Sequence, residues 1–212
     1  PIIAAILYLT VFIVTMISIL VTVTPGQTIP PTQFAPLFAS ILFIYLIGII
    51  GLILYVILVY KLARRRNTHF KRQIFLFEDL LAAVKAIATK KGVDAEVTLA
   101  SCDRTVREVK AEETEKNAVP WAILSLITGI ASWYIWYFLM KDVSKHERRE
   151  DGFWEDMSRV LDKCGIKFSA PRRTEAFPER SFVLYLILTI ITLGLFGIYW
   201  LYVLLKDPNQ HF

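Results

Sequence analysis

The chain has 212 residues, of which 55% are hydrophobic, and its mean hydropathy is +0.50. Its formal net charge is +5, yet all 24 basic and 19 acidic residues follow Tyr60. Soluble domains contain fewer apolar residues and disperse them along the chain. This distribution argues against an ordinary soluble domain. Because Lys and Arg flank the apolar segments, we expect them to face lipid headgroups and expect no nucleic-acid binding.

Four uncharged apolar segments are long enough to cross a bilayer, whose hydrocarbon core takes about 20 helical residues. We therefore predict an all-α integral membrane protein. It would contain two transmembrane helices, two glycine-broken membrane hairpins and cytoplasmic amphipathic helices. The apolar segments are residues 2–23, 37–60, 118–140 and 182–205.

Residues 1–60 are predicted to form a transmembrane helical hairpin. The first segment lacks the basic start and the small-residue cleavage site of a signal peptide, so we expect a retained span. The connecting residues 24–36 are uncharged and rich in proline, whereas residues 61–72 carry six basic side chains. Because positively charged loops stay in the cytoplasm, the proline-rich loop is predicted outside and the basic segment inside.

Residues 61–117 are predicted to be cytoplasmic and to begin with a patch that binds anionic lipid headgroups. An apolar stripe at steps of three or four residues follows, which indicates an amphipathic helix. Asn67 or Thr68 would cap its start and Gly92 would end it. The basic patch is Lys61, Arg64, Arg65, Arg66, Lys71 and Arg72, and the stripe is Phe70, Ile74, Phe77, Leu81, Val84 and Ala88.

We expect this amphipathic helix to lie along the cytoplasmic membrane surface. The alternative is a small soluble subdomain that packs the apolar stripes together. Residues 93–99, which alternate apolar and polar side chains, predict a short strand. Residues 141–180 repeat a shorter helix, which ends at Gly165 and leads into a proline-rich linker.

The segments 118–140 and 182–205 conflict with simple membrane crossing. If each crossed once, residues 141–180, which carry ten Lys and Arg, would lie outside the cell. We therefore predict that both segments bend at their centres and return to the cytoplasmic side, the alternative being plain spans. Glycine permits a turn, and threonine can bond the freed backbone groups. The predicted turn residues are Thr128, Gly129, Thr192, Gly194 and Gly197.

Aromatic side chains gather at the end of each of these two segments. Trp and Tyr favour the membrane interface, where the ring is apolar and its polar edge meets water. We interpret them as an interface belt. Its members are Trp133, Tyr134, Trp136, Tyr137, Tyr199, Trp200 and Tyr202.

A degenerate internal repeat relates three parts of the chain without gaps. Residues 118–142 align with residues 183–207 at an offset of 65, and an offset of 77 relates the first unit to the second. The three histidines of the chain therefore occupy equivalent points, each behind an apolar segment. The matched pairs include Gly129 with Gly194, Asp142 with Asp207, His146 with His211, His69 with His146 and Glu78 with Glu155.

Units packed around a common axis would bring His69, His146 and His211 together as metal ligands. We favour a structural role at the headgroup level, and expect no metal and no cofactor. The sequence contains no Gly-x-Ser-x-Gly, His-Glu-x-x-His or glycine-rich phosphate loop. We therefore expect no catalytic residues and no enzyme.

The stretch ITLGLFGIYWLYVLLKDPN (191–209) resembles the signature of an uncharacterised prokaryotic membrane family, a domain of unknown function. That signature is Thr-x-Gly-(Ile/Leu)-(Tyr/Phe)-x-(Ile/Leu)-Tyr-Trp. The resemblance is strongest over residues 181–212 and weaker over residues 118–146. It implies a bacterial or archaeal source and supplies no activity. The matching residues are Thr192, Gly194, Phe196, Tyr199, Trp200 and Asn209, and then Thr128, Gly129, Tyr134 and Trp136.

Function is expected to follow from membrane anchoring. The four apolar segments contain no ionisable residue that would bind a coupling ion. We expect a multi-pass accessory or scaffold subunit in the cell membrane of a bacterium or archaeon, with its charged segments cytoplasmic. Its partners would be anionic lipids and other membrane subunits or copies of itself. The alternatives are a homo-oligomeric channel or passive transport protein and, third, a metal-dependent membrane enzyme.

Overall fold

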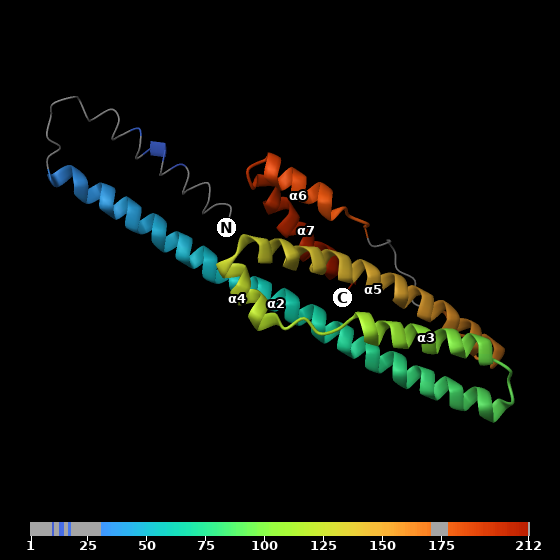
Figure 1. Ribbon diagram of the computed structural model, residues 1–212. Helices are drawn as coiled ribbons and strands as arrows, with labels where there is room; N and C mark the ends of the chain where they lie inside the picture. Colours follow the sequence, from blue (N-terminus) through green and yellow to red (C-terminus); the bar gives the residue numbers. More distant parts are fainter. Residues whose placement is uncertain (1–9, 11–12, 15–16, 18–30, 171–177, 212) are drawn as a thin grey trace. The chain divides into compact units, whose positions relative to one another are not determined.

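The computed structural model describes residues 10, 13–14, 17, 31–170 and 178–211, and every regular element in them is a helix. The all-α prediction is thereby confirmed for the described residues, whereas the first predicted span, 2–23, lies almost wholly outside them. The chain divides into two compact units, residues 1–58 and 59–212. The helices in Figure 1 are α2 (Pro31–Lys91), α3 (Glu96–Glu112), α4 (Ala118–Ile127), α5 (Gly129–Lys163), α6 (Phe182–Ile191) and α7 (Leu195–His211).

The first unit contains the apolar beginning of α2, whose large side chains are mostly exposed. Leu42 is 72% exposed and Phe43 57%, and only 6% of the most apolar stretch of the helix is buried. The core helix of a soluble protein would bury such residues. In the part of the chain that the structure describes, Ile41–Lys91 is the one helix long and apolar enough to cross a membrane.

Helix α2 continues through the predicted helix start at Asn67 and Thr68 without a break. The capping prediction is therefore wrong. Asn67 instead donates from Nδ2 to the carbonyl of Lys116 at 2.6 Å and accepts from the Lys116 N–H at 3.1 Å. The helix ends as predicted, at Lys91, with Gly92 at a φ of 64°.

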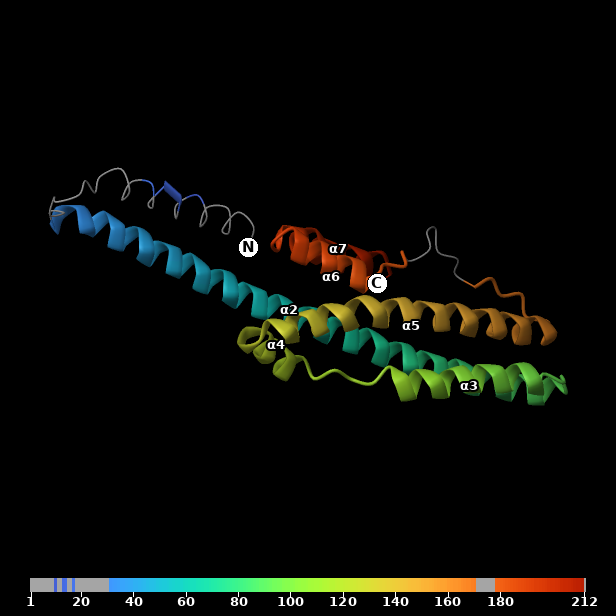
Figure 2. The same ribbon diagram turned by 45° about the horizontal axis from the view of Figure 1, so that its top comes forward.

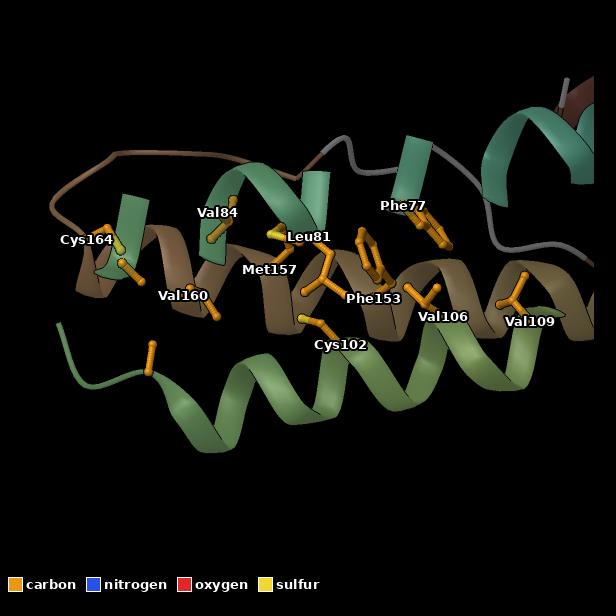
Figure 3. Close-up of a cluster of buried hydrophobic side chains, with 12 residues drawn as sticks. Phe77, Leu81, Val84, Cys102, Val106, Val109, Phe153, Met157, Val160 and Cys164 are labelled. Atoms are coloured by element: carbon orange, nitrogen blue, oxygen red, sulfur yellow. The ribbon is translucent and has the colours of Figure 1, made fainter. Parts of the chain in front are cut away.

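In the second unit, the later part of α2, α3 and α5 form a three-helix bundle (Figures 1 and 2). Contacts fix its directions. Lys85 pairs with Asp103 and Glu78 with Lys110, so α3 runs antiparallel to α2. The bundle core, shown in Figure 3, comprises Phe77, Leu81, Val84, Ala88, Ala95, Cys102, Val106, Val109, Phe153, Met157, Val160 and Cys164.

The predicted apolar stripe of α2 faces protein rather than lipid. Phe77 stacks on Phe153 of α5 at a centroid distance of 3.8 Å, and Leu81 and Val84 are buried in the same core. The expectation that this helix lies along the membrane surface is therefore wrong for its apolar face, and the packed-stripe alternative holds. The physical reason is that α3 and α5 supply matching stripes, which remove the same apolar area from water.

The predicted strand at residues 93–99 is also wrong, because α3 begins at Glu96. Cys102, Val106 and Val109 recur at helical spacing and are buried. The short alternation therefore covers only the connection from α2 and the first turn of a longer amphipathic helix, whose periodicity prevails.

Helices α4 and α5 meet at Thr128, which caps both. Its N–H donates to the carbonyl of Leu124 at 2.9 Å, and its side-chain oxygen accepts from the N–H of Ala131 at 3.3 Å. The two helices contact each other beyond this break, where Trp121 of α4 lies 4.8 Å from Tyr134 of α5 between ring centroids. The broken helix is thus held by a side chain that satisfies backbone groups on both sides.

Helices α6 and α7 are separated by residues with left-handed backbone. Leu193 has a φ of 49° and Gly194 a φ of 94°. Thr192 donates to the carbonyl of Leu188 at 2.7 Å and accepts from the N–H of Phe196 at 2.9 Å. Where these helix pairs lie relative to a membrane stays a prediction.

Candidate functional site

Helices α2 and α5 run parallel, and residues 77 positions apart face each other between them. His69 Nε2 lies 3.2 Å from His146 Nε2, and Gln73 Nε2 donates to Glu150 Oε1 at 2.8 Å. A constant offset between contacting residues requires two parallel helices of equal pitch. The internal sequence repeat has the same offset of 77, at which His69 aligns with His146.

His146 stands at the centre of a buried polar cluster. It is 1% exposed, and its Nδ1 lies 2.6 Å from Glu113 Oε2 at the end of α3. Phe70 stacks on the imidazole at a centroid distance of 4.3 Å. The Glu113 carboxylate accepts a hydrogen bond from the Nδ1–H of His146. This bond fixes the imidazole with its Nε2 facing His69.

Arginines complete the cluster and balance its charge. Arg149 Nη1 donates to Glu113 Oε1 at 3.2 Å, and Arg149 also pairs with Glu112. Glu113 therefore binds one side chain through each carboxylate oxygen. Such charge-assisted bonds are about twice as strong as neutral ones, and they fix the position of the carboxylate.

Arg66 also contacts Phe70 and is 2% exposed. Its Nη2 is 2.6 Å from Asp142 Oδ2, its Nη1 donates to the Thr114 carbonyl at 2.9 Å, and its guanidinium lies 4.4 Å from the Phe70 centroid. Burial lowers the pKa of Arg66, and the charge of Asp142 opposes that shift. An arginine remains protonated even so.

Arg66 is thus removed from the predicted lipid-binding patch, because its side chain is directed into the bundle. One helical turn of α2 carries both exposed arginines and this buried one, which the basic composition alone did not distinguish. Arg65 donates to Asn209 of α7 at 2.5 Å. The five exposed members of the patch are Lys61, Arg64, Arg65, Lys71 and Arg72.

The connection between α3 and α4 is held against α2 by side chains of α2. Asn67 binds the backbone of Lys116 in both directions, and Arg66 binds that of Thr114. These bonds place Glu113 beside His146. Sequence reasoning missed Glu113, Arg149 and the Arg66–Asp142 pair; a signal for Glu113 was its place at the end of an amphipathic helix, just before a polar linker.

A second buried ion pair stands at the aspartate equivalent to Asp142. Arg180 donates to Asp207 through Nε at 2.6 Å and Nη2 at 3.1 Å. The hydrogen bonds to Asp207 raise the pKa of Arg180. Asp207 is 4% exposed, so this two-pronged pair fastens the start of α6 to the end of α7.

The predicted aromatic belt divides between surface and interior. Trp200 is fully buried, 5.0 Å from Trp136 and 5.4 Å from Phe182 between ring centroids. Its assignment to the interface is wrong, because α6 folds over it. Trp136 is half-buried. The exposed members are Trp133, Tyr134, Tyr137, Tyr199 and Tyr202.

An open cavity of about 560 Å³ lies between α2 and the connection from α3 to α4. Asn67, Glu113 and the cations Arg64 and Lys71 are among its lining residues. Within the described residues, no group of three or more His, Cys, Asp or Glu has the geometry of a metal site. His211 ends α7, and the structure describes nothing of its side chain.

The second unit is thus a helical bundle with a buried histidine–carboxylate cluster and two helix pairs, α4–α5 and α6–α7. A family model described as "Domain of unknown function (DUF4234)" matches residues 180–212, which include α6 and α7. This match supports the resemblance to an uncharacterised family over that segment, and it does not reach His69 or His146. No curated protein and no solved structure matches the chain.

Proposed function

We propose that the protein is a membrane-anchored, non-catalytic scaffold or accessory subunit of a larger membrane assembly. The observation that carries the proposal is the exposed apolar stretch of α2, which continues as one helix into a charged, well-packed bundle. Burial of each Leu, Ile or Phe side chain is worth about 1.5–3 kcal/mol. A bilayer around α2 recovers that free energy, and the bundle provides a surface for partners.

The packing of the bundle supports a single cytoplasmic side for the charged segments. Residues 66–91 of α2 contact both α3 and residues 142–164, so all three would lie on one side of any membrane that α2 crosses. A single crossing by segment 118–140 would instead put Asp142 on the side opposite to α3. The contacts therefore favour the predicted return at Thr128.

The ends of the two helix pairs support a need for a partner. Ile127 is 69% exposed, Ile130 75% and Leu193 95%. Backbone that is not helical is tolerated at membrane depth only where protein or its own side chains satisfy it. Thr128 and Thr192 satisfy part of it, and a neighbouring subunit would shield the backbone groups that remain at these exposed turns.

The cations beside the apolar stretch support contact with anionic lipid. Arg64 and Lys71 line the cavity next to α2, and each Lys or Arg near an anionic surface contributes about 1 kcal/mol. A phosphate-bearing headgroup fits this position at the point where α2 would leave the hydrocarbon.

Two measurements test the proposal. The untagged protein should remain in the membrane pellet after alkaline extraction, and purification in mild detergent from its native membranes should yield it with larger subunits. A ring of this chain alone around a central path would favour the channel alternative. Recovery in the soluble fraction would overturn membrane anchoring altogether.

A further inference from the structure

Two imidazoles held at ligand distance are the strongest unassigned feature of the bundle. In a tetrahedral zinc site with Zn–N bonds of about 2.0–2.1 Å, neighbouring nitrogens lie about 3.3 Å apart. His69 Nε2 and His146 Nε2 are 3.2 Å apart. We propose that these two nitrogens hold a divalent late transition-metal ion, zinc above all, which clamps α2 to α5.

The surroundings of His146 are those of a ligating histidine. Ligating imidazoles commonly donate their other N–H to a carboxylate, which fixes the ring and raises the basicity of the ligating nitrogen. Glu113 Oε2 is that acceptor, 2.6 Å from His146 Nδ1. Glu113 is itself held by Arg149, and Phe70 supports the ring face.

Imidazole nitrogens select zinc, copper, nickel and iron over magnesium and calcium, which prefer oxygen. The charge is also accommodated, because Arg66 and Arg149 each have carboxylate partners of their own. In the described residues the pair supplies two ligands. Water would have to fill the remaining positions of the shell, and His69 is the less buried of the two histidines.

The clamp is independent of membrane anchoring, since it would join two helices whether or not α2 spans a bilayer. The competing explanation of the 3.2 Å contact is one proton shared between the rings. A hydrogen bond and a metal bridge differ in a measurable way. Only the bridge makes the stability of the bundle depend on zinc concentration.

The experiment uses the full chain in detergent with its affinity tag removed and its metal stripped by chelator. Zinc is titrated in competition with a chromophoric chelator, and cobalt is added separately to look for visible ligand-field bands. We expect one zinc per chain and a thermal unfolding temperature that rises with zinc. His69→Gln and His146→Gln should abolish both effects, and Glu113→Gln should weaken binding about 10–100-fold.

Gln73→Ala is the matched control, because Gln73 faces Glu150 one turn further along the same interface. It should bind zinc as the wild type does. Should His146→Gln fail to fold, His69→Gln alone decides, since His69 is only half-buried. Absence of zinc binding in the wild type, or equal binding by wild type and His69→Gln, overturns the proposal.

Discussion

Arg66 and Asp142 form an ion pair that joins α2 to α5, with Nη2 and Oδ2 2.6 Å apart. Asp207, the repeat equivalent of Asp142, is also paired with an arginine, Arg180. Each aspartate directly follows an apolar segment and each is fixed by a cation from elsewhere in the unit. The end of each apolar segment is therefore fastened to the bundle or to its own helix pair.

Arg66→Met should destabilise the bundle by about 3 kcal/mol. Removing one partner of a buried pair costs about 3–5 kcal/mol, and the lower end applies here since the Asp142 side chain is 23% exposed. Denaturant unfolding of the detergent-solubilised chain, followed by circular dichroism, measures the loss. The double variant Arg66→Met/Asp142→Leu should recover most of it. A double variant no more stable than the single one would contradict this account.

The sequence predicted features that depend on local chemistry. Gly92 and Gly165 end their helices with φ values of 64° and 71°, as their places after α2 and α5 suggest. The apolar stripe of α2 was also predicted, because periodicity survives in the amino-acid order. What the stripe packs against was not, because a partner from α3 or α5 is set by tertiary contacts.

The same limit explains the errors at single residues. Arg66 and Arg65 are neighbours of one type, yet only the tertiary positions of Asp142 and Phe70 make one of them buried. Trp200 carries no sign of burial in its own segment, since α6 and Trp136 cover it. The contact between the two histidines could have been predicted from the sequence, because the repeat offset of 77 aligns His69 with His146.

Ile50→Lys should reduce membrane retention of the protein. Ile50 is 49% exposed near the middle of the apolar stretch of α2, and a lysine at a helix centre in a bilayer costs about 2.5–3.5 kcal/mol. The fraction left in the pellet after alkaline extraction measures the effect, with Ile50→Leu as control. Equal retention of the two variants would argue against a membrane around this helix.

Gly194→Ala should destabilise the α6–α7 pair by about 1–3 kcal/mol. The φ of 94° at Gly194 is disfavoured for alanine, while an added Cβ would meet no atom within 4 Å, so strain alone acts. Thermal unfolding in detergent measures the change. Gly48→Ala in helical α2 has the same open space and should be neutral or slightly stabilising. A neutral Gly194→Ala would show that residues 193–194 adopt another backbone conformation in solution.

Cys102 should react slowly with iodoacetamide in the folded protein. Burial raises the pKa of its thiol to about 11. At pH 8 that leaves about one thiolate in a thousand, and the thiolate is the reactive form. The rate, followed by mass spectrometry, should rise about tenfold per pH unit up to pH 10, as long as the fold holds. Rapid alkylation at pH 8 without denaturant would mean that the core around Cys102 opens readily.

The topology of the charged segments provides the most direct test of the proposed arrangement. Because α2 and α5 pack in parallel and α3 packs against both, residues after Tyr60 in α2 and residues after Asp142 in α5 would share one side of any bilayer that α2 crosses. Single cysteines at Ser158, in α5, and at Thr28, in the predicted proline-rich loop, can be labelled in whole cells once Cys102 and Cys164 have been replaced by alanine. An impermeant reagent added outside whole cells should reach the cysteine at position 28 and spare the one at position 158, which should label only after permeabilisation. Denaturing detergent gives the full extent of labelling for each variant and corrects for the partial burial of Ser158.

Labelling of position 158 from outside, with position 28 protected, would invert the orientation. Labelling of both from outside would mean that 37–60 does not cross the membrane, and the arrangement around α2 would have to be abandoned.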